Sequence, residues 1–102
     1  MAGVGTLLKQ AQKMQKQIES MQASLEVQII DVSSGGGAVQ IKINGAGKFQ
    51  ALTLGADFLK EDKKFIEETI LQAVQEAALK SKEKNEAEMQ KISSGFQMPG
   101  GF

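Results

Sequence analysis

The apolar residues of this chain change their spacing twice, and this change constrains the fold more than any other feature. Near the amino end they recur every three or four positions from Leu7 to Leu25, as on one face of a helix. Residues 26–54 alternate instead between apolar and polar positions, as in strands buried on one face. Helical spacing returns beyond residue 62. We therefore predict an α+β fold: a helix, a three-stranded antiparallel sheet and a long helix.

The first helix is predicted over residues 6–25, with Thr6 as its N-cap. Its apolar seam has spacings of 4, 3, 4, 3 and 4, the a/d pattern of helices that pack on a partner. The seam consists of Leu7, Ala11, Met14, Ile18, Met21 and Leu25. The spacing fits packing on the chain's own sheet and a seam shared with a second subunit equally well.

The middle region, residues 26–54, is predicted to form a three-stranded antiparallel meander. The offset between Ile29 and Ile30 indicates an irregularity near Ile29. Three glycines at 35–37 predict a loop with positive φ, and Asn44-Gly45 predicts a hairpin turn. The glycines do not indicate a phosphate-binding loop, because a strand follows them in place of Lys-Ser/Thr and a helix.

The second helix is predicted over residues 62–93, with Asp57 or Asp62 as its cap and Gly95 as its stop. Its apolar residues cover more of the helix than one sheet face needs. We expect a second copy of the chain to contact the apolar residues that the sheet does not cover. The expected dimer-interface residues are Ile66, Ile70, Leu71, Val74 and Ala78.

The carboxyl-terminal part of the chain is mostly polar. Beyond Leu79 the second helix carries almost no apolar residue and is expected to project into solvent. Residues 94–102 are expected to form a mobile tail. With no repeat and no linker, residues 1–102 are expected to form a single domain.

Several residue types are missing: the chain has no His, Cys, Trp, Tyr or Arg. Without His or Cys it lacks the commonest general base, the activated thiol and the usual transition-metal ligands. We therefore predict that it is not an enzyme and has no cofactor, metal or small-molecule substrate. The lack of cysteine and of any long apolar run predicts a cytoplasmic protein that binds no membrane.

The charges are distributed unevenly although the net charge is zero. Residues 1–18 contain three lysines and no acid, whereas residues 19–60 carry a net charge of −1 and residues 61–102 of −2. At about 100° per residue, Lys9, Lys13 and Lys16 lie opposite the apolar seam. Lysine is a point charge suited to unspecific phosphate contacts. We expect these lysines to bind double-stranded DNA; the alternative is a face that only keeps the helix soluble.

Three segments carry a resemblance to a known family: LLKQAQKMQKQIESMQ (7–22), GGGAVQIKINGAGKFQALTL (35–54) and KISSGFQMPGGF (91–102). With their order and the chain length, they make the sequence similar to the YbaB/EbfC family of bacterial nucleoid-associated proteins. The resemblance implies a homodimer with projecting helical arms that binds duplex DNA with little sequence preference and helps to organise the chromosome or regulate expression. It implies DNA contacts by the lysines of the first helix, and secondarily by Lys80, Lys82 and Lys84.

A second hypothesis is a chaperone or adaptor that holds protein clients through its helical seam and apolar tail. The Met-containing seam and the tail residues Phe96, Met98 and Phe102 motivate it. It predicts binding that is insensitive to salt and is lost when the chain is truncated after Ser94.

Overall fold

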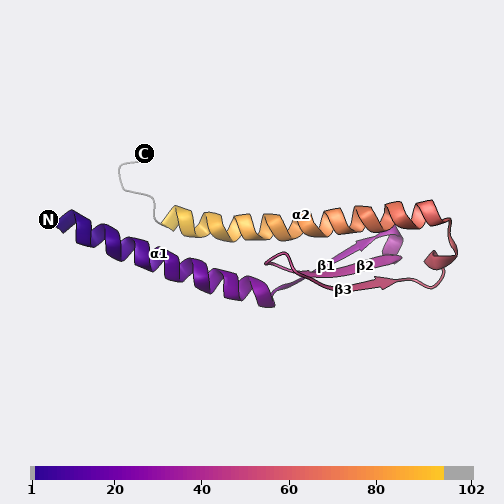
Figure 1. The fold of residues 1–102 in the computed structure, drawn as a ribbon, viewed down its shortest axis with the longest axis horizontal. Coiled ribbons are helices and arrows are strands. Elements are labelled where there is room, and N and C mark those ends of the chain that lie inside the picture. Colours follow the sequence, from indigo (N-terminus) through magenta and orange to yellow (C-terminus); the bar gives the residue numbers. More distant parts are fainter. Residues whose placement is uncertain (1, 96–102) are drawn as a thin grey trace.

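The computed structural model describes residues 2–95 and has the predicted order of a helix, three strands and a second helix (Figure 1). Both helices are long, and the molecule extends over 71 × 25 × 16 Å. The elements are α1 (Ala2–Val27), β1 (Ile29–Ser34), β2 (Val39–Asn44), β3 (Phe49–Leu54) and α2 (Lys63–Gly95), with 3-10 turns at Gly35–Gly37 and Phe58–Lys60. The predicted α+β fold is confirmed.

α1 is longer than predicted at both ends. It begins at Ala2, so Thr6 lies inside the helix and the predicted N-cap is wrong. Gly3 and Gly5 are helical although each glycine costs about 1 kcal/mol relative to alanine. Once a long helix has formed, each added residue contributes another backbone hydrogen bond, which favours extension through both glycines.

The three strands form an antiparallel sheet in the order β1-β2-β3, as predicted. Val32 of β1 and Leu52 of β3 both pair with Ile41 of β2. Cross-strand partners share a face, so these three residues lie on the inner side of the sheet. On the outer side, Lys42 Nζ lies 2.7 Å from Asp31 Oδ1 in an exposed ion pair. The predicted alternation is therefore confirmed.

The glycine loop between β1 and β2 also follows the prediction. Gly35, Gly36 and Gly37 have φ values of 62°, 68° and 96°, which favour glycine over any residue with a side chain.

The irregularity that we predicted near Ile29 is not there. β1 pairs with β2 without interruption from Ile29 to Ser34. The offset in the sequence arises because α1 continues to Val27, so the strand begins later than residue 26.

The irregularity lies instead in the pairing of β2 with β3. The register shifts between Lys42 and Ile43, and Gln50 is the extra residue of β3. This bulge brings Phe49 opposite the buried Ile43. Phe49 therefore shares the inner face with Leu52, although the two are three residues apart.

α2 packs on β1 and β2, while β3 remains at the open edge of the sheet (Figure 1). The core consists of Val32, Val39, Ile41, Ile43, Phe58, Ala73 and Ala77. The small side chains of Ala73 and Ala77 let the helix approach the sheet closely. In β3, by contrast, every residue from Phe49 to Thr53 is exposed.

Asp62 caps α2, as predicted: its Oδ2 accepts a hydrogen bond of 3.2 Å from the backbone N–H of Lys64. The helix continues to Gly95, so Ser94 and Gly95 belong to α2 and not to the predicted tail. The rest of that tail, residues 96–102, lies outside the described residues.

The outer parts of both helices extend beyond the same end of the sheet (Figure 1). Their chain directions are opposite, because α1 runs toward the sheet and α2 runs away from it. We call residues 2–24 the α1 arm and residues 82–95 the α2 arm. The projecting helical arms implied by the family resemblance are thus present within one chain.

Candidate nucleic-acid interface

Lys9, Lys13 and Lys16 are exposed on the α1 arm. Their spacing of four and three residues keeps them on one helical face over about 10 Å. No acid precedes Glu19 in α1, and no ion pair among residues 2–95 involves these three lysines. The α1 arm thus presents their charges to solvent without a carboxylate partner in the described structure.

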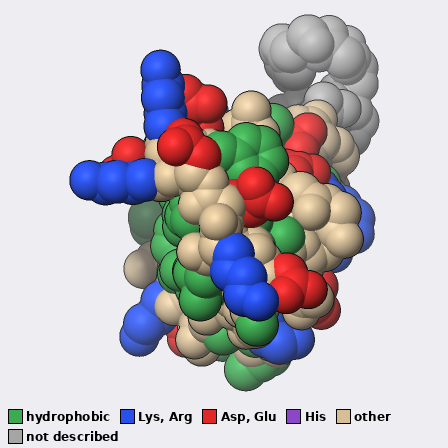
Figure 2. Space-filling view, turned by 90° about the vertical axis from the view of Figure 1, so that its right-hand side faces the viewer, with side chains coloured by type: hydrophobic (Ala, Val, Ile, Leu, Met, Phe, Trp, Pro, Cys, Tyr) green, Lys and Arg blue, Asp and Glu red, His purple; other side chains and the backbone are tan. Residues whose placement is uncertain are grey.

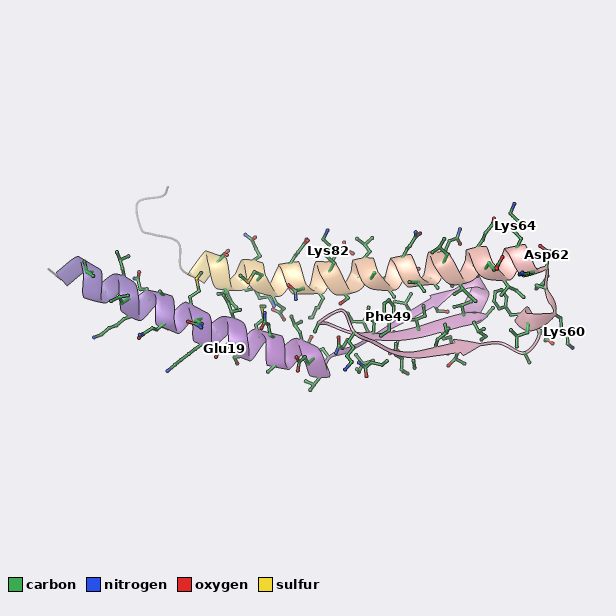
Figure 3. All side chains as sticks on the ribbon, viewed as in Figure 1. Glu19, Phe49, Lys60, Asp62, Lys64 and Lys82 are labelled. Atoms are coloured by element: carbon green, nitrogen blue, oxygen red, sulfur yellow. The ribbon has the colours of Figure 1, made fainter. Side chains whose placement is uncertain are left out.

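The three lysines predicted on α2 have a different environment, because each faces a glutamate one turn away. The Nζ-to-Oε1 distances are 3.4 Å for Lys80–Glu76, 4.0 Å for Lys82–Glu86 and 3.8 Å for Lys84–Glu88. Figure 3 locates Lys82 on α2 and Glu19 on α1. The α2 arm has three lysines and three glutamates, whereas the α1 arm has three lysines and one glutamate. The α1 arm is therefore the more positive of the two.

A groove of about 540 Å³ lies between the arms, lined by Lys13, Gln17 and Met21 of α1 and by Glu88, Lys91 and Ile92 of α2. Lys13 and Lys91 thus border the same groove although they are far apart in sequence. Lys91 was not among the predicted DNA-binding residues. Its position three residues after Glu88 predicts an ion pair within α2 but not that Lys91 borders a groove with Lys13.

Glu88 is the acidic centre of this groove. Its Oε2 accepts a hydrogen bond of 3.0 Å from Lys91 Nζ, and its Oε1 lies 3.8 Å from Lys84 Nζ. The hydrogen bond from Lys91 lowers the pKa of Glu88; burial opposes this, and the charges of Lys91 and Lys84 reinforce it. Glu88 therefore stays ionised and holds two lysines of α2.

The apolar seam of α1 becomes more exposed toward the tip of the arm. Leu25 is fully buried at the base, Ile18 and Met21 are half-buried, and Leu7 is 61% exposed. Within residues 2–95, the chain thus covers the base of the seam and leaves the outer part of the seam exposed.

The residues predicted to form a dimer interface fall into two groups. Ile66, Ile70 and Val74 are half-buried and pack against the core of the same chain. Leu71 is 56% exposed and Ala78 is exposed. Some of the apolar residues of α2 that were predicted to contact a second copy therefore pack within one chain.

An uncovered apolar surface lies at the open edge of the sheet. Phe49 is 47% exposed and Leu52 is 53% exposed. They line a hollow of about 360 Å³ together with Ile41, Ala51 and Val74. Seen from the sheet end, apolar side chains reach the surface between projecting lysines (Figure 2). Both residues lie in the meander predicted over residues 26–54, and neither is among the predicted dimer-interface residues.

Within the described part of the chain, no three acidic side chains converge as a metal site would require. Neither helix, over its described length, is apolar enough to cross a membrane.

Comparisons with known proteins agree with this picture. Residues 1–96 match the YbaB/EbfC DNA-binding family. The chain is similar to a nucleoid-associated protein of Clostridium novyi (strain NT), with 36% identity over 100 residues, covering 97% of this chain and 88% of the relative. Its fold is similar to the crystal structure of an uncharacterized protein of Helicobacter pylori, with a TM-score of 0.67 and 22% identity, covering 76% of this chain and 90% of that one. The chain therefore belongs to the YbaB/EbfC DNA-binding family, a family of DNA-binding proteins rather than enzymes.

Proposed function

We propose that this protein is a nucleoid-associated protein that binds duplex DNA with little sequence preference, through phosphate contacts made by the α1 arm. The observation that carries the proposal is the row of Lys9, Lys13 and Lys16, exposed and without an ion-pair partner among the described residues. A lysine neutralises a phosphate without reading a base, because its ammonium group is a point charge. Membership of a DNA-binding family and the name of the Clostridium novyi relative support this function.

Lys80, Lys82 and Lys84 act as secondary contacts in this proposal. Each would exchange a glutamate of its own helix for a phosphate, so its net gain on binding is smaller. Because an exposed ion pair contributes only about 0–1 kcal/mol, losing the pair with glutamate costs little, and replacing it by a phosphate contact is only weakly favourable.

We further propose that the protein acts as a homodimer. Phe49 and Leu52 of β3 line one hollow with Val74 of α2, and Leu71 is exposed one helical turn before Val74. A second copy of the chain would cover these apolar side chains. Burying such side chains stabilises an interface by roughly 25 cal/mol per Å² of apolar area removed from water. Ile66, Ile70, Val74 and Ala78 would lie at or beneath this surface. A dimer would double the number of α1-arm lysines available to one duplex.

The chaperone or adaptor hypothesis rests on a different observation. Leu7 and Leu8 at the tip of α1 are 61% and 60% exposed, and they offer an apolar surface to a client protein. A chaperone function gives no role to Lys9, Lys13 and Lys16, which are exposed and have no ion-pair partner among the described residues. We therefore rank this hypothesis second.

Fluorescence anisotropy of a labelled duplex of roughly 30 base pairs, titrated at several salt concentrations, tests the proposed function. We expect saturable binding that weakens steeply with salt and differs little between unrelated sequences. Absence of binding even at low salt would contradict the proposal. Salt-insensitive binding of an unfolded client protein would then favour the chaperone hypothesis.

A further inference from the structure

Both arms leave the sheet at the turn of residues 45–48, and the buried Asn44 organises this turn. Asn44 is only 3% exposed. Its side-chain Oδ1 accepts hydrogen bonds from the backbone N–H of Ala46 (3.0 Å) and of Lys48 (2.8 Å). One side-chain oxygen thus fixes the path of the chain between β2 and β3.

The same turn is bonded to the end of α1. The Nδ2 of Asn44 donates to the carbonyl oxygen of Glu26 (3.1 Å). The backbone N–H of Gly45 donates to the carbonyl oxygens of Leu25 (2.9 Å) and Gln28 (3.1 Å). The last carbonyls of a helix have no partner within the helix, and here the turn supplies donors for two of them.

The turn is also bonded to α2 at the point where the α2 arm begins. Ser81 is 2% exposed, and its Oγ donates a hydrogen bond of 2.8 Å to the carbonyl oxygen of Asn44. Asn44 therefore contacts both helices, through its side chain on one side and its carbonyl group on the other.

We propose that this turn is a pivot that sets the directions of both arms, with Asn44 and Ser81 as positioning residues. Gln12 lies 13 residues before Leu25, about 20 Å along α1, so a rotation of about 10° at the base would move it by about 3 Å. Such a displacement is as long as a hydrogen bond and would misplace lysine contacts along the arm. The consequence for DNA rests on the proposed function; the control of arm direction does not.

The distance between the arms tests the proposal directly. The chain has no cysteine, so spin labels can be attached at introduced Gln12→Cys and Gln90→Cys without removing a native thiol. Labelled protein is diluted with unlabelled protein, so that distances within one chain dominate, and electron paramagnetic resonance measures the distribution. A second pair, Gln40→Cys and Gln72→Cys, reports the sheet and the inner half of α2.

Two variants, called the tether variants, each remove one side-chain hydrogen bond between the turn and a helix. Asn44→Asp keeps an oxygen acceptor for the turn but loses the donor to Glu26, and Ser81→Ala loses the bond to Asn44. Gln75→Glu makes the same amide-to-carboxylate change on an exposed side chain of α2, and Ser93→Ala removes an exposed serine of α2. All variants are compared at a temperature at which circular dichroism shows them folded.

We expect both tether variants to shift or broaden the distance between the arms by about 3 Å or more, while the core pair and both controls keep the wild-type distance. Unchanged arm distances in both tether variants would overturn the proposal. An equal change in the core pair would also overturn it, because it would indicate general loosening of the fold. If the wild-type protein failed to bind DNA, the proposed function would fail and this distance result would stand.

Discussion

A Cβ atom on Gly45 would lie 2.7 Å from Cδ2 of Leu25, so the β2–β3 turn touches the end of α1 without room for a side chain. Leu25 is fully buried, and its carbonyl oxygen accepts a hydrogen bond from the backbone N–H of Gly45, so neither residue can move aside easily. We predict that Gly45→Ala lowers the free energy of unfolding by about 1–3 kcal/mol, as overpacking of a core does. Urea denaturation followed by circular dichroism measures this change.

Gly5→Ala is the matched control for that substitution. Nothing lies within 4 Å of a Cβ at Gly5, which is inside α1. Because alanine favours a helix by about 1 kcal/mol over glycine, this variant is expected to be as stable as the wild type or more stable. Equal effects of the two substitutions would contradict a specific contact between Gly45 and Leu25.

The proposed dimer surface predicts opposite results for two neighbouring residues of β3. Leu52 pairs with the buried Ile41 and is 53% exposed, whereas Thr53 pairs with Gln40 on the outer face. Leu52→Asp should reduce the molar mass in solution from two chains to one, because it would bury a charge in an apolar interface. Thr53→Asp should leave the mass unchanged. Light scattering coupled to size exclusion distinguishes the outcomes, and an unchanged mass for Leu52→Asp would argue against this surface.

The ion pairs of Glu88 predict that removing this acid strengthens DNA binding. Glu88→Gln frees Lys84 and Lys91 from their shared partner. Glu83→Gln removes the same charge from an exposed glutamate that forms no ion pair among the described residues. The salt slope is the slope of the logarithm of the DNA-binding constant against the logarithm of the salt concentration. We expect this slope to steepen by up to about 1.8 with Glu88→Gln, at roughly 0.9 per additional phosphate contact, and to change less with Glu83→Gln. Equal effects would mean that only net charge matters.

The lowered pKa of Glu88 also predicts how its contribution to stability depends on pH. The hydrogen bond from Lys91 holds the folded-state pKa below the ordinary value of 4.5, so the ionised pair stabilises the folded protein above that pH. The contribution is lost as the pH falls through the lowered pKa. The difference in unfolding free energy between wild type and Glu88→Gln should therefore shrink on acidification from neutral pH. A difference that grows in acid would contradict this linkage.

The regular elements could be predicted from the sequence because their signals are local. The spacing from Leu7 to Leu25 indicated α1, and the alternation of Val39, Ile41 and Ile43 indicated β2. Asp62 provided a cap that needs only the residues next to it. The predicted start of α1 was wrong because Thr6 is an acceptable cap when only its neighbours are considered. No residue near it prevents the helix from extending to Ala2.

The parts that could not be predicted depend on contacts between distant residues. Asn44-Gly45 was correctly identified as a turn, but its bonds to α1 and α2 join residues 18 and 37 positions apart. The ion pairs of Lys80, Lys82 and Lys84 were foreseeable from i,i+4 spacing, yet the groove that Lys13 and Lys91 share was not. The bulge at Gln50 moves Phe49 to the inner face, which strict alternation would have denied.

The salt dependence of DNA binding by two triple-lysine variants tests the central claim most directly. One variant replaces Lys9, Lys13 and Lys16 by Gln. The control replaces Lys60, Lys63 and Lys64 by Gln, three exposed lysines at the start of α2 and in the turn before it. Figure 3 shows Lys60 and Lys64 at the end of the molecule opposite the arms. If the α1 arm contacts phosphates, the first variant should lose up to about 2.7 in salt slope for each bound chain, at roughly 0.9 per contact, and the control much less. Equal slopes in the two variants would contradict the claim that the α1 arm holds the DNA.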